Sequence, residues 1–483
     1  MADILDLDAT GQLAALAQKR ISAAELLKAA LTRHDRLHAG LNAVVMADPE
    51  RALERARAID DLRAKGEAPG LLGGLPMTVK DTFDAVGMAA SSGLAALRQR
   101  QAEDATAVAH AKAAGAVIWG KTNTPVMAGD WQTFNDLYGT TNNPWDPTRT
   151  PGGSSGGAAA ALAAQVTALE IGSDIGGSLR VPANFCGVFS HKPTWGLVPQ
   201  HGHVPPGPGS WTERDLNVVG PMARSARDLR LLLSVLAGGS VAAKAPAAEL
   251  KGARIGLWLD EPSFPLDPEV RSVLEGFAGA LAAQGAEVTT IPCPVDARAL
   301  LSAYLMLLGA VLSEDLPPAA LRQMQMMRAL AKIARKRDAD PHSASAMALA
   351  YTATHREWMA ADAVRCRLRH DIDATFERFD AILAPIAPVP AFPHDHRPFQ
   401  KRSLRLSTGA AVPYTSMVCW ISLATALHLP ATTVPAGRTG AGLPVGAQLI
   451  GPRGGDARTL ALAQAIDEAV GGFVAPPPAA ADA

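Results

Sequence analysis

The sequence contains 483 residues, of which 48% are hydrophobic and 19% are charged, and its formal net charge at pH 7 is −1. This composition is typical of a soluble globular protein rather than a disordered one, and the balanced charge argues against binding to nucleic acid or to an anionic membrane. The four cysteines are far apart and form no CxxC pair, which argues against a disulfide framework or a zinc site and favours reduced thiols in a cytoplasmic protein.

The N-terminal segment has no apolar signal core, and no run of about 18 apolar residues occurs along the chain, so we expect no membrane-spanning helix. Ser22 and Glu25 form a capping box that opens an amphipathic helix. Further along, strands alternate with helices, which is typical of α/β layers with helices on both faces of a sheet. No repeat or long linker divides the chain, so we expect one large domain. The predicted helices cover 22–38, 48–65, 106–115, 222–237, 268–283, 354–378 and 455–470, and the predicted strands cover 73–81, 116–120, 168–174, 254–259, 286–291 and 381–386.

Two short motifs match functional patterns that their surroundings do not support. The stretch GAVIWGKT (115–122) fits the phosphate-binding pattern G-x-x-x-x-G-K-[ST], but its middle residues are typical of a buried strand, and Pro125 prevents a regular helix directly after it. The stretch GGSSGG (152–157) fits the nucleophile elbow G-x-S-x-G, yet several prolines before it predict a loop where an elbow needs a strand. Glycine and serine in a tight loop at a helix start also need no catalytic role.

The stretch ALEIGSDIGGSLRVPANFCGVFSHKPT (168–194) combines a predicted strand with a glycine turn. The two glycines of DIGGS let successive backbone N–H groups converge, and such a nest can hold an oxyanion. Ser178 stands at the end of this turn. Asp174 and Arg180 flank it and can support the loop through a charge-assisted hydrogen bond. The stretch therefore favours a site that stabilises negative charge beside Ser178.

Together these stretches resemble the amidase signature family of serine hydrolases. The resemblance implies the α/β fold of that family, a single large domain over 1–471 with a central mixed β-sheet covered by helices on both faces. Within it we expect N-terminal helices at 1–70, a catalytic core at 71–240 and a helical cover over the pocket at 300–370, followed by a disordered tail at 472–483. The motifs that carry the resemblance are, in order, GGLPMTVKD, GKTNTP, YGTTNNPWD, PGGSSGGAAAALAA, GSDIGGSLRVPANFCGVFSHKPTWG, GPMARSARDL and GLPVGAQLIG.

The resemblance also implies a Ser–cis-Ser–Lys triad. Lys80 in LPMTVKD is then the base, Ser154 is the bridging serine next to a cis peptide bond, and Ser178 is the nucleophile. A serine hydroxyl needs a base, and a lysine serves as one only when burial without a carboxylate partner lowers its pKa. A lone lysine is usually a solvated charge on the surface. Here the surrounding motifs favour a buried base instead. The backbone N–H groups expected to hold the oxyanion belong to Ile175, Gly176, Gly177 and Ser178.

Several nearby residues have both a structural and a functional interpretation. We expect Ser155 to support the triad, and this role is favoured over the alternative, the N-cap of the following helix. His191, His201 and His203 suggest a Ser–His pair, but no carboxylate spacing accompanies them, and surface or loop histidines are the commoner case. Cys186 is more typical of a small buried residue than of a nucleophile.

Two features bear on the substrate. By resemblance, the stretch after GKTNTP lines the acyl pocket. Segment 300–330 is apolar and Met-rich, which suits either a pocket cover or helices packed in an ordinary core. We therefore expect an uncharged amide with an apolar or aryl part, and esters or carbamates can follow the same acyl chemistry. The candidate pocket residues are Ala128, Gly129, Asp130 and Trp131.

The motifs also resemble the subunit of the tRNA-dependent amidotransferase that takes ammonia from glutamine. That relative has an E-F-A-M-G stretch and an R-R-I-x-L-G-T-Y segment, whereas this chain has PVMAGDWQTFND at 125–136 and no counterpart of the second segment in 318–370. A stand-alone amide hydrolase is therefore favoured, and the glutamine-hydrolysing subunit is the alternative. We expect a small-molecule amide as partner, no cofactor, no metal, no nucleic acid and no membrane, and a homodimer is left open.

Overall fold

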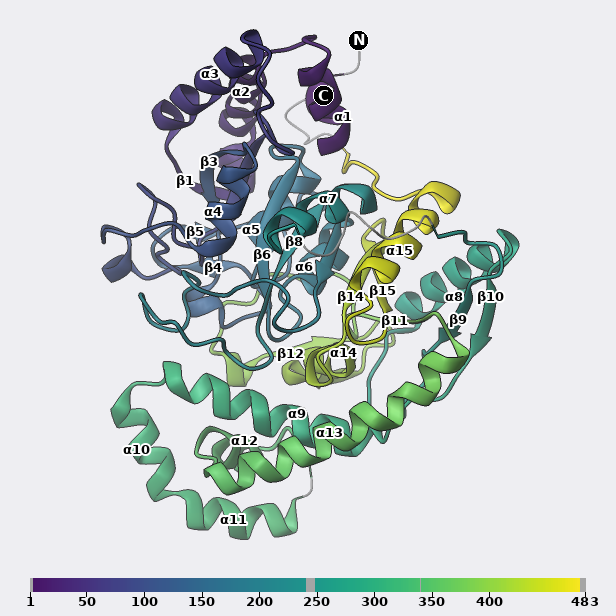
Figure 1. Cartoon of the computed structure of the whole chain (residues 1–483). Helices are drawn as coiled ribbons and strands as arrows, with labels where there is room; N and C mark the ends of the chain where they lie inside the picture. The colour runs from purple at the N-terminus through teal and green to yellow at the C-terminus, as the bar shows by residue number, and fades with distance from the viewer. Residues whose placement is uncertain (1–2, 240–247, 339, 478–483) are drawn as a thin grey trace.

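The centre of the protein is a mixed sheet of 11 strands (Figure 1). The computed structural model describes residues 3–239, 248–338 and 340–477. In spatial order the strands are β1 (Val44–Ala47), β3 (Val117–Thr122), β2 (Pro76–Lys80), β6 (Leu169–Asp174), β8 (Val218–Ala223), β7 (Phe189–Lys192), β14 (Ala431–Arg438), β15 (Pro444–Ile450), β11 (Ala381–Pro385), β9 (Arg254–Leu257) and β10 (Glu287–Thr290). β2 is parallel to β3 and β6, and β9 is parallel to β10 and β11, whereas the other neighbours are antiparallel. Two small hairpins lie outside it: β4 (Phe134–Asn135) with β5 (Gly139–Thr140), and β12 (Ser403–Arg405) with β13 (Ala411–Pro413).

Both faces of this sheet are buried. Every residue of β3 and β6 is buried, although successive side chains of a strand point to opposite faces. In β11, Ala381 and Leu383 join one hydrophobic cluster, whereas Ile382 and Ala384 join another. The predicted α/β domain, with a mixed sheet covered on both faces, is confirmed.

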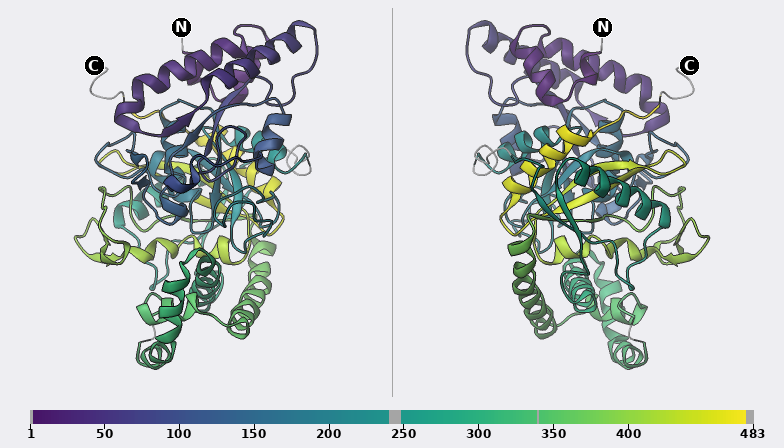
Figure 2. Two further views of the ribbon diagram at one scale, coloured as in Figure 1. Left: turned by 90° about the vertical axis from the view of Figure 1, so that its left-hand side faces the viewer. Right: turned by 90° about the vertical axis from the view of Figure 1, so that its right-hand side faces the viewer.

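Helices surround the sheet, and α9 to α13 lie together at the end of the molecule opposite the two termini (Figures 1 and 2). α2 (Ala23–Leu41) begins with the predicted capping box of Ser22 and Glu25. The other helices are α1 (Ala9–Ala17), α3 (Pro49–Ala64), α4 (Thr106–Ala113), α5 (Gly156–Ala163), α6 (Arg180–Cys186), α7 (Ala226–Leu236), α8 (Pro268–Ala283), α9 (Ala297–Leu312), α10 (Pro318–Met326), α11 (Arg328–Arg337), α12 (Ala344–Tyr351), α13 (His355–Arg378), α14 (Ser422–Ala426) and α15 (Asp456–Val470).

A strand interrupts the helix predicted over 222–237. β8 occupies the start of that range, and α7 begins only at Ala226. β8 is antiparallel to both β6 and β7, and all 6 of its residues are buried. Gly220 and Pro221 hide this strand in the sequence, because both residue types are rare in the interior of strands. Strands β1, β7, β14 and β15 are likewise absent from the predicted elements.

The structure agrees with the predicted strand in the GAVIWGKT stretch and with the predicted loop before the GGSSGG serines. The stretch 115–122 enters β3, where Lys121 is fully buried and its Nζ lies 3.2 Å from the Asp81 carboxylate. Because Lys121 belongs to a strand and is paired with Asp81, this stretch is not a phosphate-binding loop. The GGSSGG stretch begins in an irregular loop at 151–155, and its last two glycines are the first residues of α5.

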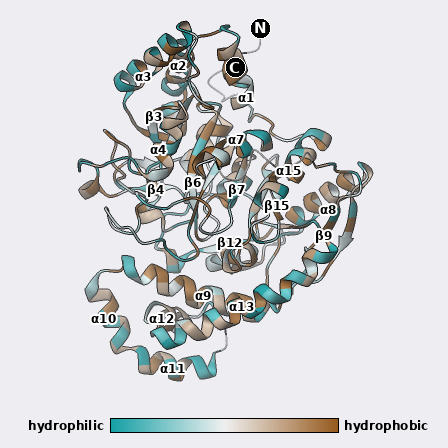
Figure 3. Cartoon of the chain, in the orientation of Figure 1, coloured by the Kyte–Doolittle hydropathy of each residue, from teal (hydrophilic) through white to brown (hydrophobic). Residues whose placement is uncertain are grey.

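α9, counted with the short turn that ends at Asp315, is the one helix among the described residues that is long and apolar enough to span a membrane. One of its faces packs in the hydrophobic core through Leu300, Tyr304 and Leu307. Another face lines a cavity that is part of the candidate site. Hydrophobic colour marks much of α9, whereas α11 and α13 also carry many hydrophilic residues (Figure 3). The apolar sequence of α9 therefore suits a helix between a core and a cavity.

The predicted tail at 472–483 is described only in its first part. Phe473 packs against the hydrophobic core, and its ring centroid lies 5.8 Å from the Arg224 guanidinium carbon. This contact joins the start of the segment to the domain. Residues 478–483 lie outside the described residues.

Candidate active site

Lys80 is the last residue of β2 and lies inside the protein. Its side chain is fully buried, and its Nζ is 2.6 Å from Ser154 Oγ and 3.0 Å from Ser173 Oγ. Burial lowers the pKa of Lys80 to about 7, while the negative charge of Asp174 opposes that shift. A large fraction of the amine is therefore neutral near neutral pH, as a general base requires.

Ser154 lies in the loop before α5, and the peptide bond from Gly153 to Ser154 is cis. Close packing requires glycine at 153, because a Cβ atom there would lie 2.5 Å from the Asp130 carbonyl oxygen. The Ser155 hydroxyl makes no capping hydrogen bond to α5. Instead, the Ser155 backbone N–H donates to the Ser178 carbonyl oxygen at 3.2 Å, which connects the two serine loops.

Ser178 follows the turn after β6 and lines a cavity. The residue is 6% exposed, and its hydroxyl makes no hydrogen bond to another described residue, Ser154 included. Catalytic hydrogen bonds are often long without substrate and shorten when it binds. The Ser178 hydroxyl is therefore free to form a hydrogen bond or a covalent bond with a molecule that enters the cavity.

Backbone N–H groups of the DIGGS turn have different partners. Gly177 N–H donates to Asp174 Oδ1 at 2.9 Å, and Leu179 N–H donates to Asp174 Oδ2 at 3.1 Å. Gly177 therefore holds the turn itself, and its N–H is removed from the oxyanion hole expected from the sequence. The N–H groups of the turn that have no acceptor among the described residues are those of Ile175, Gly176 and Ser178.

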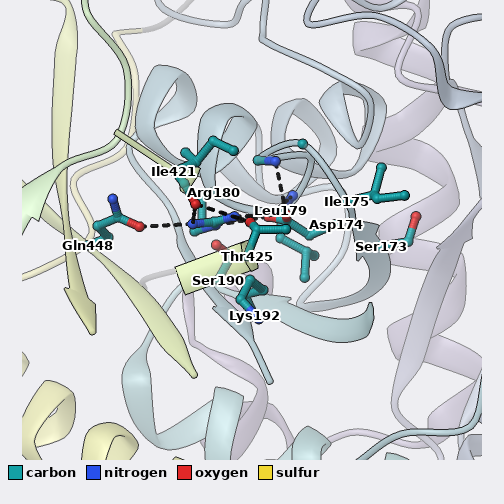
Figure 4. A network of polar contacts seen from close by, with 12 residues as sticks. Ser173, Asp174, Ile175, Leu179, Arg180, Ser190, Lys192, Ile421, Thr425 and Gln448 are labelled. Atoms are coloured by element: carbon teal, nitrogen blue, oxygen red, sulfur yellow. Dashed lines mark hydrogen bonds and ion pairs between the residues drawn. The ribbon is translucent and has the colours of Figure 1, made fainter. Parts of the chain in front are cut away.

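A buried ion pair holds this turn in place (Figure 4). Arg180 Nε and Nη2 each donate to an oxygen of Asp174 at 3.0 Å, and both side chains are fully buried. Arg180 also donates to the Ile421 carbonyl oxygen and to the side chains of Thr425 and Gln448. Burial alone would raise the pKa of Asp174, but the Arg180 guanidinium and its hydrogen bonds hold it below its usual value. The carboxylate thus stays charged and keeps both of its backbone partners.

We expect Arg180→Met to lower the free energy of unfolding by about 3–5 kcal/mol, because it leaves the buried Asp174 carboxylate without its partner. Urea unfolding followed by circular dichroism measures the loss. The control is Arg254→Met, which removes a guanidinium that is 44% exposed from its pair with Asp380. An exposed pair of this kind contributes little to stability, so this variant should lose far less than Arg180→Met. Equal losses in the two variants would contradict the supporting role of the buried pair.

A cavity of about 430 Å³ lies beside Ser178 and has mostly apolar walls. α9 contributes Leu305 and Met306 to these walls, and α12 contributes Met347. Helices of segment 300–370 thus form part of the wall of the cavity beside Ser178. The lining also includes Ala128, Gly129, Asp130, Trp131, Ile175, Gly176, Phe399 and Val418.

All four candidate substrate-binding residues line this cavity, and two of them also have partners in the protein. The Asp130 carboxylate accepts hydrogen bonds from Arg402 at 2.5 Å and from the Tyr414 hydroxyl at 2.7 Å, so its charge is compensated. Trp131 Nε1 donates to the Gly176 carbonyl oxygen at 2.7 Å. Its indole therefore holds the DIGGS turn while adding apolar surface to the cavity.

Two residues next to the site, Ser173 and Tyr304, are missing from the sequence-based candidates, and a third, His203, was expected to be an ordinary loop histidine. Ser173 Oγ lies 2.8 Å from His203 Nε2, and the Tyr304 hydroxyl donates to the Ile175 carbonyl oxygen at 2.9 Å. Ser173 had a usable signal, because β6 is parallel to β2, the strand that ends at Lys80. Tyr304 belongs to the distant helix α9, so no local pattern marks it, and no local pattern shows that the loop of His203 lies beside Ser173.

The other residues considered as a nucleophile or a base make contacts that are typical of a structural role. His191 is buried in β7 with its Nε2 3.1 Å from the Asp456 carboxylate, and burial raises the pKa of the Cys186 thiol. His201 stacks on Trp211, with ring centroids 3.8 Å apart. His203 differs from the expected loop histidine, since it is buried beside Ser173. In the part of the chain that the structure describes, no group of three His, Cys, Asp or Glu side chains is arranged to hold a metal ion.

Comparisons with curated proteins extend over nearly the whole chain. A family model described as Amidase matches residues 25–460. A glutamyl-tRNA(Gln) amidotransferase subunit of Gloeobacter violaceus is 31% identical, with 97% of this chain and 97% of that protein covered. The same subunit of Chloroflexus aurantiacus is 32% identical, with 93% of this chain and 94% of that protein covered.

Solved structures agree with the fold. A crystal structure of an amidase superposes with a TM-score of 0.77 at 29% identity, covering 96% of this chain and 99% of the other. A bacterial aryl acylamidase of the amidase signature enzymes family superposes with a TM-score of 0.78 at 25% identity, covering 96% of each chain. The chain belongs to the amidase family, and it is an enzyme that hydrolyses amide C–N bonds.

Proposed function

We propose that this enzyme is a stand-alone amidase whose substrate carries an apolar or aryl part beside the scissile carbonyl. The observation that carries this proposal is the apolar cavity next to Ser178, with walls from α9 and α12. An apolar group placed there leaves water, which is favourable in proportion to the area buried. Phe399 and Trp131 also line the cavity and suit an aryl group.

The proposed reaction uses the triad as a proton relay. Neutral Lys80 accepts a proton from Ser154, Ser154 accepts the proton of Ser178, and Ser178 Oγ forms a bond to the carbonyl carbon. The proton then returns through Ser154 to the leaving nitrogen as the C–N bond breaks. Water, activated by the same base, hydrolyses the acyl-enzyme and releases the acid. Esters and carbamates can follow this route, because only the leaving group differs. The oxyanion accepts hydrogen bonds from the N–H groups of Ile175, Gly176 and Ser178.

The alternative is a glutamine-hydrolysing subunit of a tRNA-dependent amidotransferase. The two curated relatives described above are subunits of such an amidotransferase. Glutamine carries an amino group and a carboxylate, and each needs a polar partner when it is buried. The charged side chains in the cavity wall already have partners. Asp130 pairs with Arg402, and Arg335 donates to two backbone carbonyl oxygens near the end of α11. This arrangement favours a neutral substrate.

The test is the turnover of neutral aryl and alkyl amides, esters, carbamates and glutamine by the purified chain without a partner protein. We expect kcat/KM for a neutral aryl amide to exceed that for glutamine by about 100-fold or more, since the amino group and carboxylate of glutamine would be buried there without polar partners. Comparable or better turnover of glutamine, alone or only after candidate partner proteins are added, would favour the amidotransferase role instead.

A variant in the cavity wall makes the test specific. Leu305→Trp narrows the cavity, so kcat/KM for a bulky aryl amide should fall about 10- to 200-fold, with a smaller effect on a short alkyl amide. The matched control is Leu330→Trp on α11, because Leu330 is 65% exposed and lies outside the cavity. Equal effects of the two substitutions would show that this cavity does not hold the substrate.

A cytoplasmic location is part of the same proposal. All four cysteines are free, and Cys186 and Cys419 are buried. Free thiols persist in a reducing compartment. Size-exclusion chromatography would decide whether the enzyme is a monomer or a homodimer.

A further inference from the structure

We propose that His203 is a positioning residue that sets the direction of proton transfer in the triad: through Ser173 it keeps the electron pair of the Lys80 amine directed at Ser154. This inference rests on the proposed function of Lys80, Ser154 and Ser178. It adds a residue that touches no reacting atom and acts through one intervening hydroxyl.

His203 is carried by a loop that packs on the chain segment directly after β2. Val204 N–H donates to the Thr82 carbonyl oxygen at 2.7 Å, and an isolated antiparallel bridge joins His203 to Phe83. The imidazole meets the Phe83 ring edge-on, with centroids 5.0 Å apart. None of these contacts uses a ring nitrogen, so the loop keeps its place without them.

The partners of the ring determine where its hydrogen lies. His203 Nδ1 is 2.6 Å from the Pro205 carbonyl oxygen, which can only accept, so Nδ1 carries the hydrogen. Burial, together with the positive charges of Lys80 and Arg214, lowers the pKa of His203 to about 3 against the opposing effect of the bond to Pro205. The ring is therefore neutral near pH 7, with an acceptor at Nε2.

The acceptor at Nε2 fixes which atom donates in the two hydrogen bonds of the Ser173 hydroxyl. Ser173 donates its hydroxyl hydrogen to His203 Nε2 at 2.8 Å, so its oxygen can only accept from Lys80 Nζ, which lies 3.0 Å away. Lys80 donates one N–H to Ser173, and its electron pair stays unused on that side. The other side-chain partner of Nζ is Ser154 Oγ at 2.6 Å, and the electron pair is left for the Ser154 hydrogen.

Without an acceptor at 203, the Ser173 hydroxyl can rotate and donate to Lys80 instead. It then occupies the electron pair that Ser154 needs. We expect His203→Phe, which keeps a ring beside Phe83, to lower kcat and the rate of fluorophosphonate labelling of Ser178 by roughly 10- to 100-fold, with little change in KM. The loss should persist on the high-pH plateau, because deprotonating Lys80 does not move the competing hydroxyl.

Ser173→Ala provides the decisive comparison. Alone it removes one hydrogen bond to Lys80 and should slow labelling by about 10-fold or less. Combined with His203→Phe it removes the competing hydroxyl, so the double variant should label faster than His203→Phe. A purely structural role of His203 would make the two losses add. His203→Gln, whose side-chain oxygen can accept from Ser173, should stay close to wild type.

Fluorophosphonate labelling requires the base but no particular amide substrate. It therefore tests the triad and the role of His203 separately. If the fluorophosphonate does not modify Ser178 of the wild type, the proposed function falls, and this inference with it. If the wild type is labelled but His203→Phe reacts equally fast, or Ser173→Ala does not restore it, only the role of His203 is overturned. His203→Leu carries the same comparison should the unfolding midpoint show that the phenylalanine variant does not fold.

Discussion

In a Ser178→Ala variant, we expect amide hydrolysis to fall by about 10⁴-fold or more, because formation of the acyl-enzyme loses its nucleophile. The variant should take up no fluorophosphonate, whereas the wild type should take up one group per chain. Ser154→Ala keeps the nucleophile and loses the relay, so it should still form the adduct on Ser178, roughly 10²- to 10⁴-fold more slowly. Intact mass followed by peptide mapping distinguishes the two variants.

Ser302→Ala is the matched control, because Ser302 lines the same cavity as Ser178. It should form the adduct at the wild-type rate. An adduct on Ser154 of the wild type would contradict the assignment, since the G-x-S-x-G match at 152–156 would then mark the attacking serine. The experiment therefore decides which of two neighbouring serine loops supplies the nucleophile.

Local motifs carry enough information for the parts of the site that are close in sequence. Asp174 and Arg180 flank the glycine turn of DIGGS, and their ion pair follows from that spacing. The contact between Lys80 and Ser154 spans 74 residues, so it was predictable only through the resemblance to a family. The mixed sheet was likewise predictable in outline, from alternating strands and helices, while β8, whose interior combines Gly220 with Pro221, was not.

Packing between distant segments explains what the sequence did not reveal. Tyr304 reaches the Ile175 carbonyl oxygen across 129 residues because α9 packs beside the DIGGS turn. His203 reaches Ser173 because its loop pairs with the segment after β2. Gly177 marks another limit. Its residue type predicts a turn, but which N–H of that turn faces Asp174 depends on dihedral angles that only the folded chain determines.

Replacing Lys80 by methionine should inactivate the enzyme and also change how its stability depends on pH. The pKa of Lys80 is lowered from 10.5 to about 7 by burial. Between these two values the unfolded chain holds a proton that the folded chain has lost, so the stability of the wild type rises with pH in this window. The penalty for burying the charged amine is complete below about pH 7 and disappears above the unfolded pKa. Methionine has a similar length and no titratable group, so this pH-dependent contribution to stability is absent from the variant. The variant also lacks the base, and its kcat should fall about 10²- to 10⁴-fold.

Urea unfolding at about pH 7 and at about pH 9 measures this difference. We expect the wild type to gain about 2 kcal/mol of unfolding free energy relative to Lys80→Met between the two conditions. The hydroxyls of Ser154 and Ser173 lose a partner in the variant, but that cost does not depend on pH and cancels in the comparison. Lys251→Met, at an exposed position, should show no such change. A difference that stays constant with pH would mean that Lys80 is charged in the folded protein, and a charged amine has no electron pair with which to accept the proton of Ser154.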